Sequence, residues 1–297
     1  MADRRERAAI AAQTVHILSA GSYQVPSGKT ISIASELNHA INETRLFRPG
    51  QIARIAASDP AKLGPCQFQV SNRTTLSAAQ QLHAEYGAER IALLNFASAR
   101  NPGGGFLSGS QAQEESLARA SGMYASISRM TDYYEANRRE RSALYTDHMI
   151  YSPLVPVFRD DANRLIDEPW CVSMITAPAV NAGAVRSNEP HNVSRIREVM
   201  NRRIQSVLAL AAHYGHDAVV LGAWGCGVFA NDPHEVAKLF ADHLLGSGRY
   251  AQAFSRVIFA VLDRRGDILR PFAERFGDAE EAIGEWKNRE QETGNEE

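Results

Sequence analysis

Short apolar runs that alternate with helical patterns constrain the fold of this chain more than any other feature. Each run is short enough and apolar enough to be a strand, and the candidates are 66–71, 90–96, 171–177, 217–222 and 256–263. Periodic patterns between them predict helices after Thr74, from about Ala112, over 132–147, over 193–214, and over 232–245, where Asp232 is the cap and Pro233 the first residue. This alternation predicts an α/β fold in which helices cover both faces of a parallel or mixed sheet.

The first 64 residues lack this regular alternation. A helix is predicted over 4–19 and a strand over 30–34, whereas 47–65 is polar with several Gly and Pro. We interpret 1–64 as an N-terminal accessory region, largely helical, that packs on a core domain spanning 65–276. Residues 277–297 are polar, end in QETGNEE, and are interpreted as a tail.

Charge and cysteine usage exclude several classes of protein. The net charge of -2 gives no basic excess for binding duplex nucleic acid. The three cysteines, Cys66, Cys171 and Cys226, lack the number and spacing of a disulfide framework or a zinc site, which predicts a reducing, cytoplasmic location. The sequence contains neither a signal-peptide pattern nor a run of roughly 18 apolar residues, so we expect no membrane association.

Two glycine-rich loops each follow a buried strand and precede a helix. The first is Asn101-Pro102-Gly103-Gly104-Gly105, and the second runs from Gly222 to Asp232 with Gly225 and Gly227 at its centre. In open α/β sheets ligands bind beyond the carboxyl ends of the strands, where glycines let backbone N–H groups approach a phosphate. The alternative is that the glycines only form tight turns. In the second loop, Trp224 is expected to pack beneath the backbone, and Cys226 is interpreted as a small loop residue instead of a nucleophile.

Seven residues separate Gly105 from the triplet Gln113-Glu114-Glu115, which lies in the predicted first turn of a helix. Acidic residues there can simply complement the helix dipole. Their position beside a triple-glycine loop, at the edge of the sheet where ligands bind, instead favours a role in chemistry.

The run GGG, seven residues and then QEE resembles the signature of poly(ADP-ribose) glycohydrolases. The wider segment LNFASARNPGGGFLSGSQAQEESLARAS is similar to the bacterial type, as are VSNRTTLSAA at 70–79 and LGAWGCGVFAND at 221–232. The resemblance covers most of the chain and is clearest over 66–263. It implies a three-layer macrodomain fold, with a mixed sheet between two layers of helices, and an ADP-ribose site.

The resemblance also implies roles for individual residues. Glu115 would be the catalytic residue, Glu114 would hold ribose hydroxyls, and Gln113 would shape that pocket. The backbone near the diphosphate and distal ribose would come from both loops, namely Gly103, Gly104 and Gly105, and Gly225, Cys226, Gly227, Val228 and Phe229, with the Phe229 ring packed near the distal ribose. In animal members an asparagine lies four residues before GGG, whereas this chain has Ala99 there.

Hydrolysis of a ribose–ribose bond requires an acid for the leaving oxygen and a base for water. Adjacent helical residues point about 100° apart, so we expect one glutamate to act as acid and then base while the other positions the substrate. The sequence therefore predicts hydrolysis of poly(ADP-ribose) to ADP-ribose without a metal or redox cofactor. The partners would be the polymer or ADP-ribosylated protein, with ADP-ribose as product ligand. The alternatives are a non-catalytic ADP-ribose reader and a hydrolase of mono-ADP-ribosyl conjugates.

Overall fold

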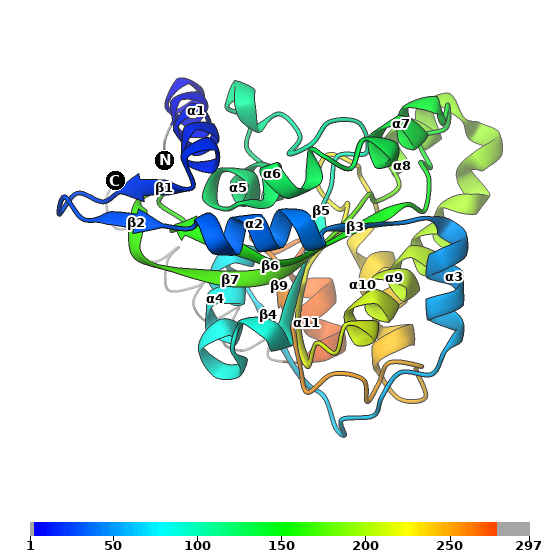
Figure 1. Cartoon of the computed structure of the whole chain (residues 1–297). Helices are drawn as coiled ribbons and strands as arrows, with labels where there is room; N and C mark the ends of the chain where they lie inside the picture. The colour runs from blue at the N-terminus through cyan, green and yellow to red at the C-terminus, as the bar shows by residue number, and fades with distance from the viewer. Residues whose placement is uncertain (1–2, 278–297) are drawn as a thin grey trace, which may run out of the picture.

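A seven-stranded mixed sheet lies at the centre of the protein, shown in Figure 1 as a computed structural model that describes residues 3–277. The strands of this sheet follow the order β3-β6-β7-β5-β8-β9-β4, and β1 and β2 form a separate hairpin. The strand bounds are β1 (Ser22–Gln24), β2 (Thr30–Ser32), β3 (Arg45–Phe47), β4 (Gln67–Ser71), β5 (Ile91–Phe96), β6 (Met149–Arg159), β7 (Leu165–Ala177), β8 (Ala218–Leu221) and β9 (Arg256–Ala260).

The five strands at one side of the sheet are parallel. β4 pairs with β9, β9 with β8, β8 with β5, and β5 with β7, all in parallel register. β6 and β3 complete the sheet as antiparallel strands. The carboxyl ends of β4, β5, β7, β8 and β9 therefore lie at one edge, where ligands bind in folds of this class.

Helices cover both faces of the sheet (Figure 1). They are α1 (Arg4–Ala20), α2 (Ala34–Glu43), α3 (Pro49–Ala57), α4 (Thr75–Tyr86), α5 (Gln113–Ala120), α6 (Met123–Ile127), α7 (Thr131–Arg139), α8 (Ala182–Asn188), α9 (Ile196–His213), α10 (Pro233–Leu244) and α11 (Arg270–Phe276). Short 3₁₀ turns are η1 (Ala88–Arg90), η2 (Phe106–Ser108) and η3 (Pro190–Arg195).

Alternating side chains divide the interior into two cores. In β5, Ile91 and Leu93 pack into one core with helices α1, α2 and α4 to α7, whereas Ala92 and Leu94 pack into the other. The second core includes buried residues of α3 and α8 to α11. Because successive strand residues point to opposite faces, a nearly continuous apolar run fills both cores, and the predicted three-layer α/β architecture is confirmed.

The N-terminal region contributes to the sheet as well as covering it. β3 pairs with β6 through Arg45 and Tyr151, so this region supplies the edge strand. Residues 47–65, for which no element was predicted, contain α3, which begins at Pro49 and buries Ile52. The sequence boundary at residue 64 stays a prediction, and residues 278–297 of the proposed tail lie outside the described residues. No helix within 3–277 is long and apolar enough to cross a membrane.

β6 and α7 are among the elements that differ from the sequence prediction. β6 was missed because Pro153 and Pro156 lie inside it, and proline is rare within strands since it cannot donate a ladder hydrogen bond. β3 pairs only with 149–151, so both prolines lie beyond that pairing. The helix predicted over 132–147 is wrong in its second half, because α7 ends at Arg139 and the chain continues as a loop to β6.

Candidate active site

The two glycine loops lie side by side because the strands before them are neighbours. β5 and β8 pair in parallel, with Ile91 opposite Ala218, so both chains leave the sheet at the same edge. The first loop runs from β5 through η2 to α5, and the second runs from β8 to α10. The sheet topology thereby brings the glycines of both loops to the edge where α5 and α10 begin.

The first loop closes over the two glutamates at Gly104. This residue has a φ of +59°, which favours glycine. A Cβ atom at this position would lie 2.4 Å from Oε1 of Glu115 and 3.2 Å from Oε2 of Glu114. The backbone of the loop can therefore approach both carboxyl groups only because residue 104 has no side chain.

Glu114 is buried, with 3% of its surface exposed. Its Oε2 accepts a hydrogen bond of 2.6 Å from the Ser98 backbone N–H, and its Oε1 lies 3.4 Å from the donating amide of Asn95. Burial raises the pKa of Glu114 to about 8, although these two hydrogen bonds oppose the rise. The carboxyl group of Glu114 is therefore mostly protonated at neutral pH, and it points inward from α5.

Glu115 is half-buried and turns towards the first loop. Its Oε1 accepts a hydrogen bond of 3.0 Å from the Gly105 backbone N–H. The helix begins after Ala112, which makes no side-chain cap, and no capping box is formed at this end of α5. The carboxylate therefore binds the glycine loop instead of capping its own helix, which favours a role in the site over a role restricted to the helix dipole.

Gln113 fixes α5 against the end of β5. Its Oε1 accepts from the Phe96 backbone N–H at 2.9 Å, and its Nε2 donates to the Leu94 carbonyl at 2.7 Å and to Thr75 Oγ1 at 3.2 Å. Both amide hydrogens and the amide oxygen are engaged within the protein. The side chain thus shapes the site by locking the register between α5, β5 and the start of α4.

The second loop is held by internal hydrogen bonds and leaves its central residues open. Asn231 donates through Nδ2 to the carbonyls of Val180 (2.7 Å) and Gly225 (3.1 Å). A Cβ atom at Gly225 would lie 2.5 Å from that Nδ2, whereas one at Gly227 would meet nothing within 4 Å. Val228 is 95% exposed. Gly225 is therefore required by the loop itself, and the space beside Gly227 is free for a ligand.

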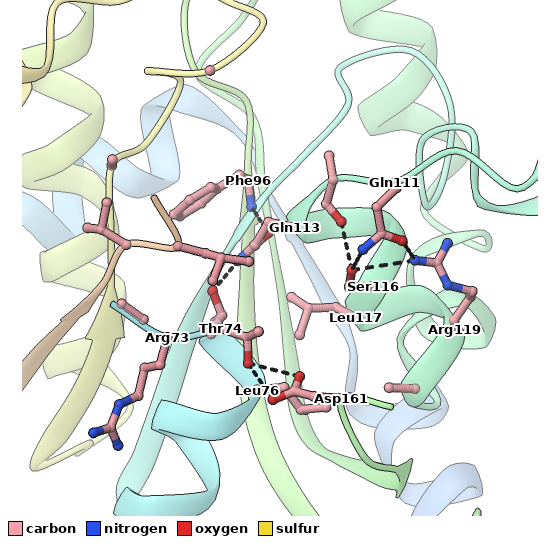
Figure 2. A pocket seen from close by; sticks show the side chains of 18 of the residues that line it. Arg73, Thr74, Leu76, Phe96, Gln111, Gln113, Ser116, Leu117, Arg119 and Asp161 are labelled. Carbon is pink, nitrogen blue, oxygen red and sulfur yellow. Dashed lines mark hydrogen bonds between the residues drawn. The ribbon is translucent and has the colours of Figure 1, made fainter. Parts of the chain in front are cut away.

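A cavity of about 380 Å³ reaches from the start of α4 to both loops. Figure 2 shows the Phe96 ring and Gln113 beside it, with the Thr74 hydroxyl donating to Asp161 across its lower side. Gly227 of the second loop also lines the cavity. Its size suits a small-molecule ligand. Of the described residues, those that line the cavity do not include Glu114 or Glu115, which lie on the side of α5 that faces the first loop.

Sequence reasoning missed several apolar residues of this cavity. Phe96, Leu262 and Ile268 come from β5 and from the segment after β9, and they line the same cavity. Phe96 could have been found, since it is the last residue of a buried strand at the ligand edge. Leu262 and Ile268 carry no local signal that would distinguish them from ordinary loop residues.

Comparison with known proteins identifies the family. A family model described as microbial-type PARG, catalytic domain, matches residues 11–160. The poly(ADP-ribose) glycohydrolase (PARG) from Thermomonospora curvata has a solved structure that is 47% identical, covering 92% of this chain and 100% of that chain, with a TM-score of 0.87. The chain belongs to the microbial-type PARGs. Comparison with curated protein sequences gave no match.

Two further PARG structures match this chain, and their crystals contain small molecules. The Thermomonospora curvata PARG bound to the inhibitor ADP-HPD is also 47% identical, covers 92% of this chain and all of that chain, and has a TM-score of 0.86. The Deinococcus radiodurans PARG in complex with ADP-ribose is 44% identical, with 82% of this chain and 98% of that chain covered and a TM-score of 0.77.

Several other residues lie in or beside the two loops of this PARG. Trp224 is fully buried and packs beneath the second loop, as expected. Burial raises the pKa of the Cys226 thiol to about 12, so it is a poor nucleophile at neutral pH. Ala99 is buried and Asn101 is exposed, and the asparagine that faces Glu114 is Asn95. No group of three or more His, Cys, Asp or Glu within 3–277 could hold a metal ion.

Proposed function

We propose that this PARG hydrolyses ribose–ribose O-glycosidic bonds of poly(ADP-ribose) and releases ADP-ribose, with Glu115 as general acid and base. The observation that carries the proposal is its membership of the microbial-type PARGs. Both glycine loops and the Gln113-Glu114-Glu115 triplet lie at one edge of the sheet, as an ADP-ribose site requires.

The chemistry needs one proton to move twice. Glu115 gives its proton to the oxygen that leaves with the remaining polymer, while the bond from that oxygen to the anomeric carbon breaks. Water then bonds to the anomeric carbon, and the Glu115 carboxylate takes a proton from it. The products are ADP-ribose and a polymer shortened by one unit, and Glu115 recovers its proton.

Glu114 is suited to binding a ribose hydroxyl without adding charge. Burial raises its pKa to about 8, so at neutral pH its carboxyl group is mostly neutral and can both donate and accept hydrogen bonds. Neutrality also avoids repulsion between a second carboxylate and the diphosphate of the substrate. The Ser98 N–H and Asn95 hold the side chain in one orientation.

The diphosphate is assigned to the second loop. Backbone from Gly225 through Phe229 would wrap it, with Cys226 and Val228 contributing main-chain atoms only and Phe229 lying near the distal ribose. The support is the open space beside Gly227 and its position on the cavity wall. Gly103, Gly104 and Gly105 would close the site from the other side. We also infer a reducing, cytoplasmic location, supported by three cysteines that are all free.

The decisive experiment is product analysis. Defined poly(ADP-ribose) and singly ADP-ribosylated protein are each incubated with the enzyme, and released products are identified by mass spectrometry. We expect ADP-ribose from the polymer. Tight binding without release would indicate a reader, and release from the singly modified protein alone would indicate a mono-ADP-ribosyl hydrolase.

A further inference from the structure

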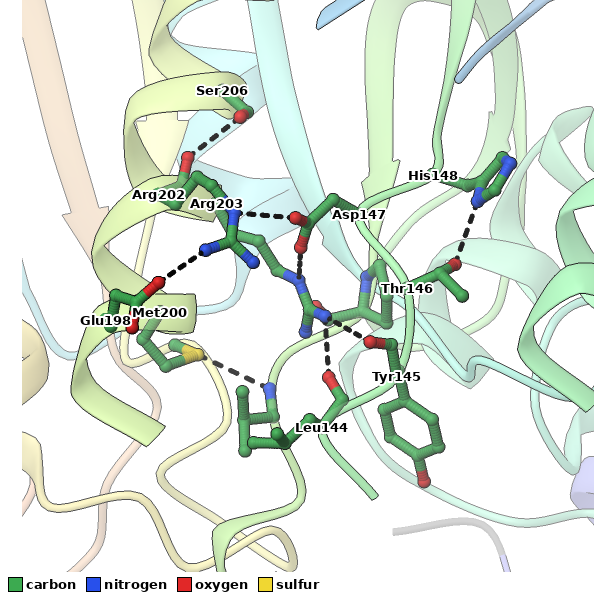
Figure 3. Close-up of polar contacts among 12 residues, drawn as sticks. Leu144, Tyr145, Thr146, Asp147, His148, Glu198, Met200, Arg202, Arg203 and Ser206 are labelled. Atoms are coloured by element: carbon green, nitrogen blue, oxygen red, sulfur yellow. Dashed lines mark hydrogen bonds and ion pairs between the residues drawn. The ribbon is translucent and has the colours of Figure 1, made fainter. Parts of the chain in front are cut away.

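The loop between α7 and β6, residues 140–148, is anchored by a fully buried arginine. Arg203 of α9 has no exposed surface, and Figure 3 shows its guanidinium among the backbone of this loop. Its Nε donates to Asp147 Oδ1 at 2.7 Å, and its Nη1 donates to the Pro178 carbonyl at 3.0 Å. Its Nη2 donates to the carbonyls of Leu144 at 2.6 Å and Tyr145 at 3.0 Å. One side chain therefore fixes three points of the chain around Tyr145.

Tyr145 has a backbone conformation that is unfavourable for an aromatic residue. Its φ is +59°, in the left-handed region that glycine and asparagine adopt more readily. Arg203 holds the carbonyls of Leu144 and Tyr145, and Asn137 Oδ1 accepts from both the N–H and the hydroxyl of Thr146 at 2.9 Å. Strain of this kind persists only where surrounding contacts enforce it, and it is concentrated at functional sites.

The enforced conformation directs the tyrosine ring away from its anchor. In Figure 3 the ring points away from Arg203 and Asp147. The ring centroid of Tyr145 lies 6.2 Å from that of Phe229, the last residue of the segment assigned to the diphosphate. Tyr145 is half-buried. A glycine or an asparagine would suffice if the turn needed only a left-handed backbone. The aromatic ring at this position therefore calls for a separate explanation.

We propose that Tyr145 is a substrate-positioning residue. Its ring and that of Phe229 would form an aromatic wall against the distal ribose of bound ADP-ribose. Arg203 and Asp147 act as positioning residues through Tyr145, because Arg203 binds the carbonyls of Leu144 and Tyr145 and Asp147 fixes the Arg203 guanidinium. Aromatic rings supply a large apolar surface at fixed orientation, which suits the C–H face of a sugar. The inference rests on the proposed function, since it assumes that the site binds ADP-ribose.

The test separates the ring from the backbone. Tyr145→Asn removes the ring but tolerates the left-handed conformation, whereas Tyr145→Phe keeps the ring. We expect Tyr145→Asn to raise the Kd for ADP-ribose by about tenfold or more, a loss of about 1.4 kcal/mol, with an unchanged melting temperature. Tyr145→Phe should bind within about threefold of the wild type. Equal binding by wild type and Tyr145→Asn, or equal weakening in both variants, would overturn the assignment.

A double-mutant cycle tests the anchor. Asp147→Asn should weaken ADP-ribose binding in the wild-type background but add little in the Tyr145→Asn background, because both changes act through the same ring. An equal effect in both backgrounds would show that Asp147 does not act through Tyr145. Calorimetry with ADP-ribose does not depend on turnover. A wild type that binds ADP-ribose but leaves polymer uncut would therefore contradict the proposed hydrolysis and not this inference.

Discussion

Replacement of Glu114 by glutamine should change how the stability of the protein depends on pH. Burial raises the pKa of Glu114 from 4.5 to about 8 in the folded protein. The stability that comes from its favoured neutral form is fully present below pH 4.5 and is lost as the pH rises through about 8. Glutamine does not titrate, and its amide oxygen can still accept from the Ser98 N–H.

The expected magnitude follows from the two pKa values. One pH unit between folded and unfolded pKa values corresponds to about 1.4 kcal/mol. A rise from 4.5 to about 8 therefore makes the ionised form about 5 kcal/mol less favourable in the folded protein, and about 4 kcal/mol of this develops between pH 5 and pH 9. The difference in unfolding free energy, Glu114→Gln minus wild type, should grow by that amount over this range.

The assay is urea unfolding of both proteins at several pH values from 5 to 9, with the wild type as its own reference at each pH. Glu36→Gln is a matched control, because it makes the same change at an exposed position on α2. Its difference from the wild type should stay within about 0.5 kcal/mol at every pH. A Glu114→Gln difference as flat as that of the control would refute the argument that burial keeps this carboxyl group neutral.

Three further outcomes are expected. Glu115→Gln should lower polymer hydrolysis by about 10²–10⁴-fold, because glutamine cannot supply a proton. Calorimetry should still detect ADP-ribose binding by this variant. Near-normal turnover would reassign the acid to Glu114. Gly227→Val should keep the wild-type melting temperature but weaken ADP-ribose binding. Gly225→Val should lower the melting temperature as well, since the valine side chain would collide with Asn231. Binding by folded Gly227→Val as tight as that of the wild type would place the diphosphate elsewhere. ADP-ribose binding and polymer hydrolysis should both be unchanged in a chelator, and activity restored only by a divalent ion would contradict this.

Features set by neighbouring residues could be predicted from the sequence, and features set by distant contacts could not. Thr74 caps α4, and Asp232 with Pro233 begins α10, as predicted, because capping depends on residues within one helical turn. The end of α7 was missed because the loop after it is held by Arg203, which lies more than fifty residues further along the chain. Local periodicity contains no information about such a contact.

The same distinction applies to the site. The glycine loops and the glutamate triplet are contiguous motifs, so a resemblance could identify them. Their arrangement depends on the sheet: β5 and β8 are neighbours although more than 100 residues separate them in sequence. Leu262 and Ile268 also line the cavity, and they come from a third segment, which follows β9. No local pattern in the sequence reveals that β9 pairs with β8 and β4.

The two adjacent glutamates reach different environments because α5 turns by about 100° per residue. Glu114 points inward to Asn95 and the Ser98 N–H, where burial keeps it neutral, and Glu115 points to the Gly105 N–H at the loop. Neither arrangement is what helix stability alone would favour, since α5 begins without a side-chain cap and a buried carboxyl group opposes folding above neutral pH. A glutamine at 114 would avoid that cost, so the carboxyl groups are better explained by what they do for a bound sugar than by what they do for the fold.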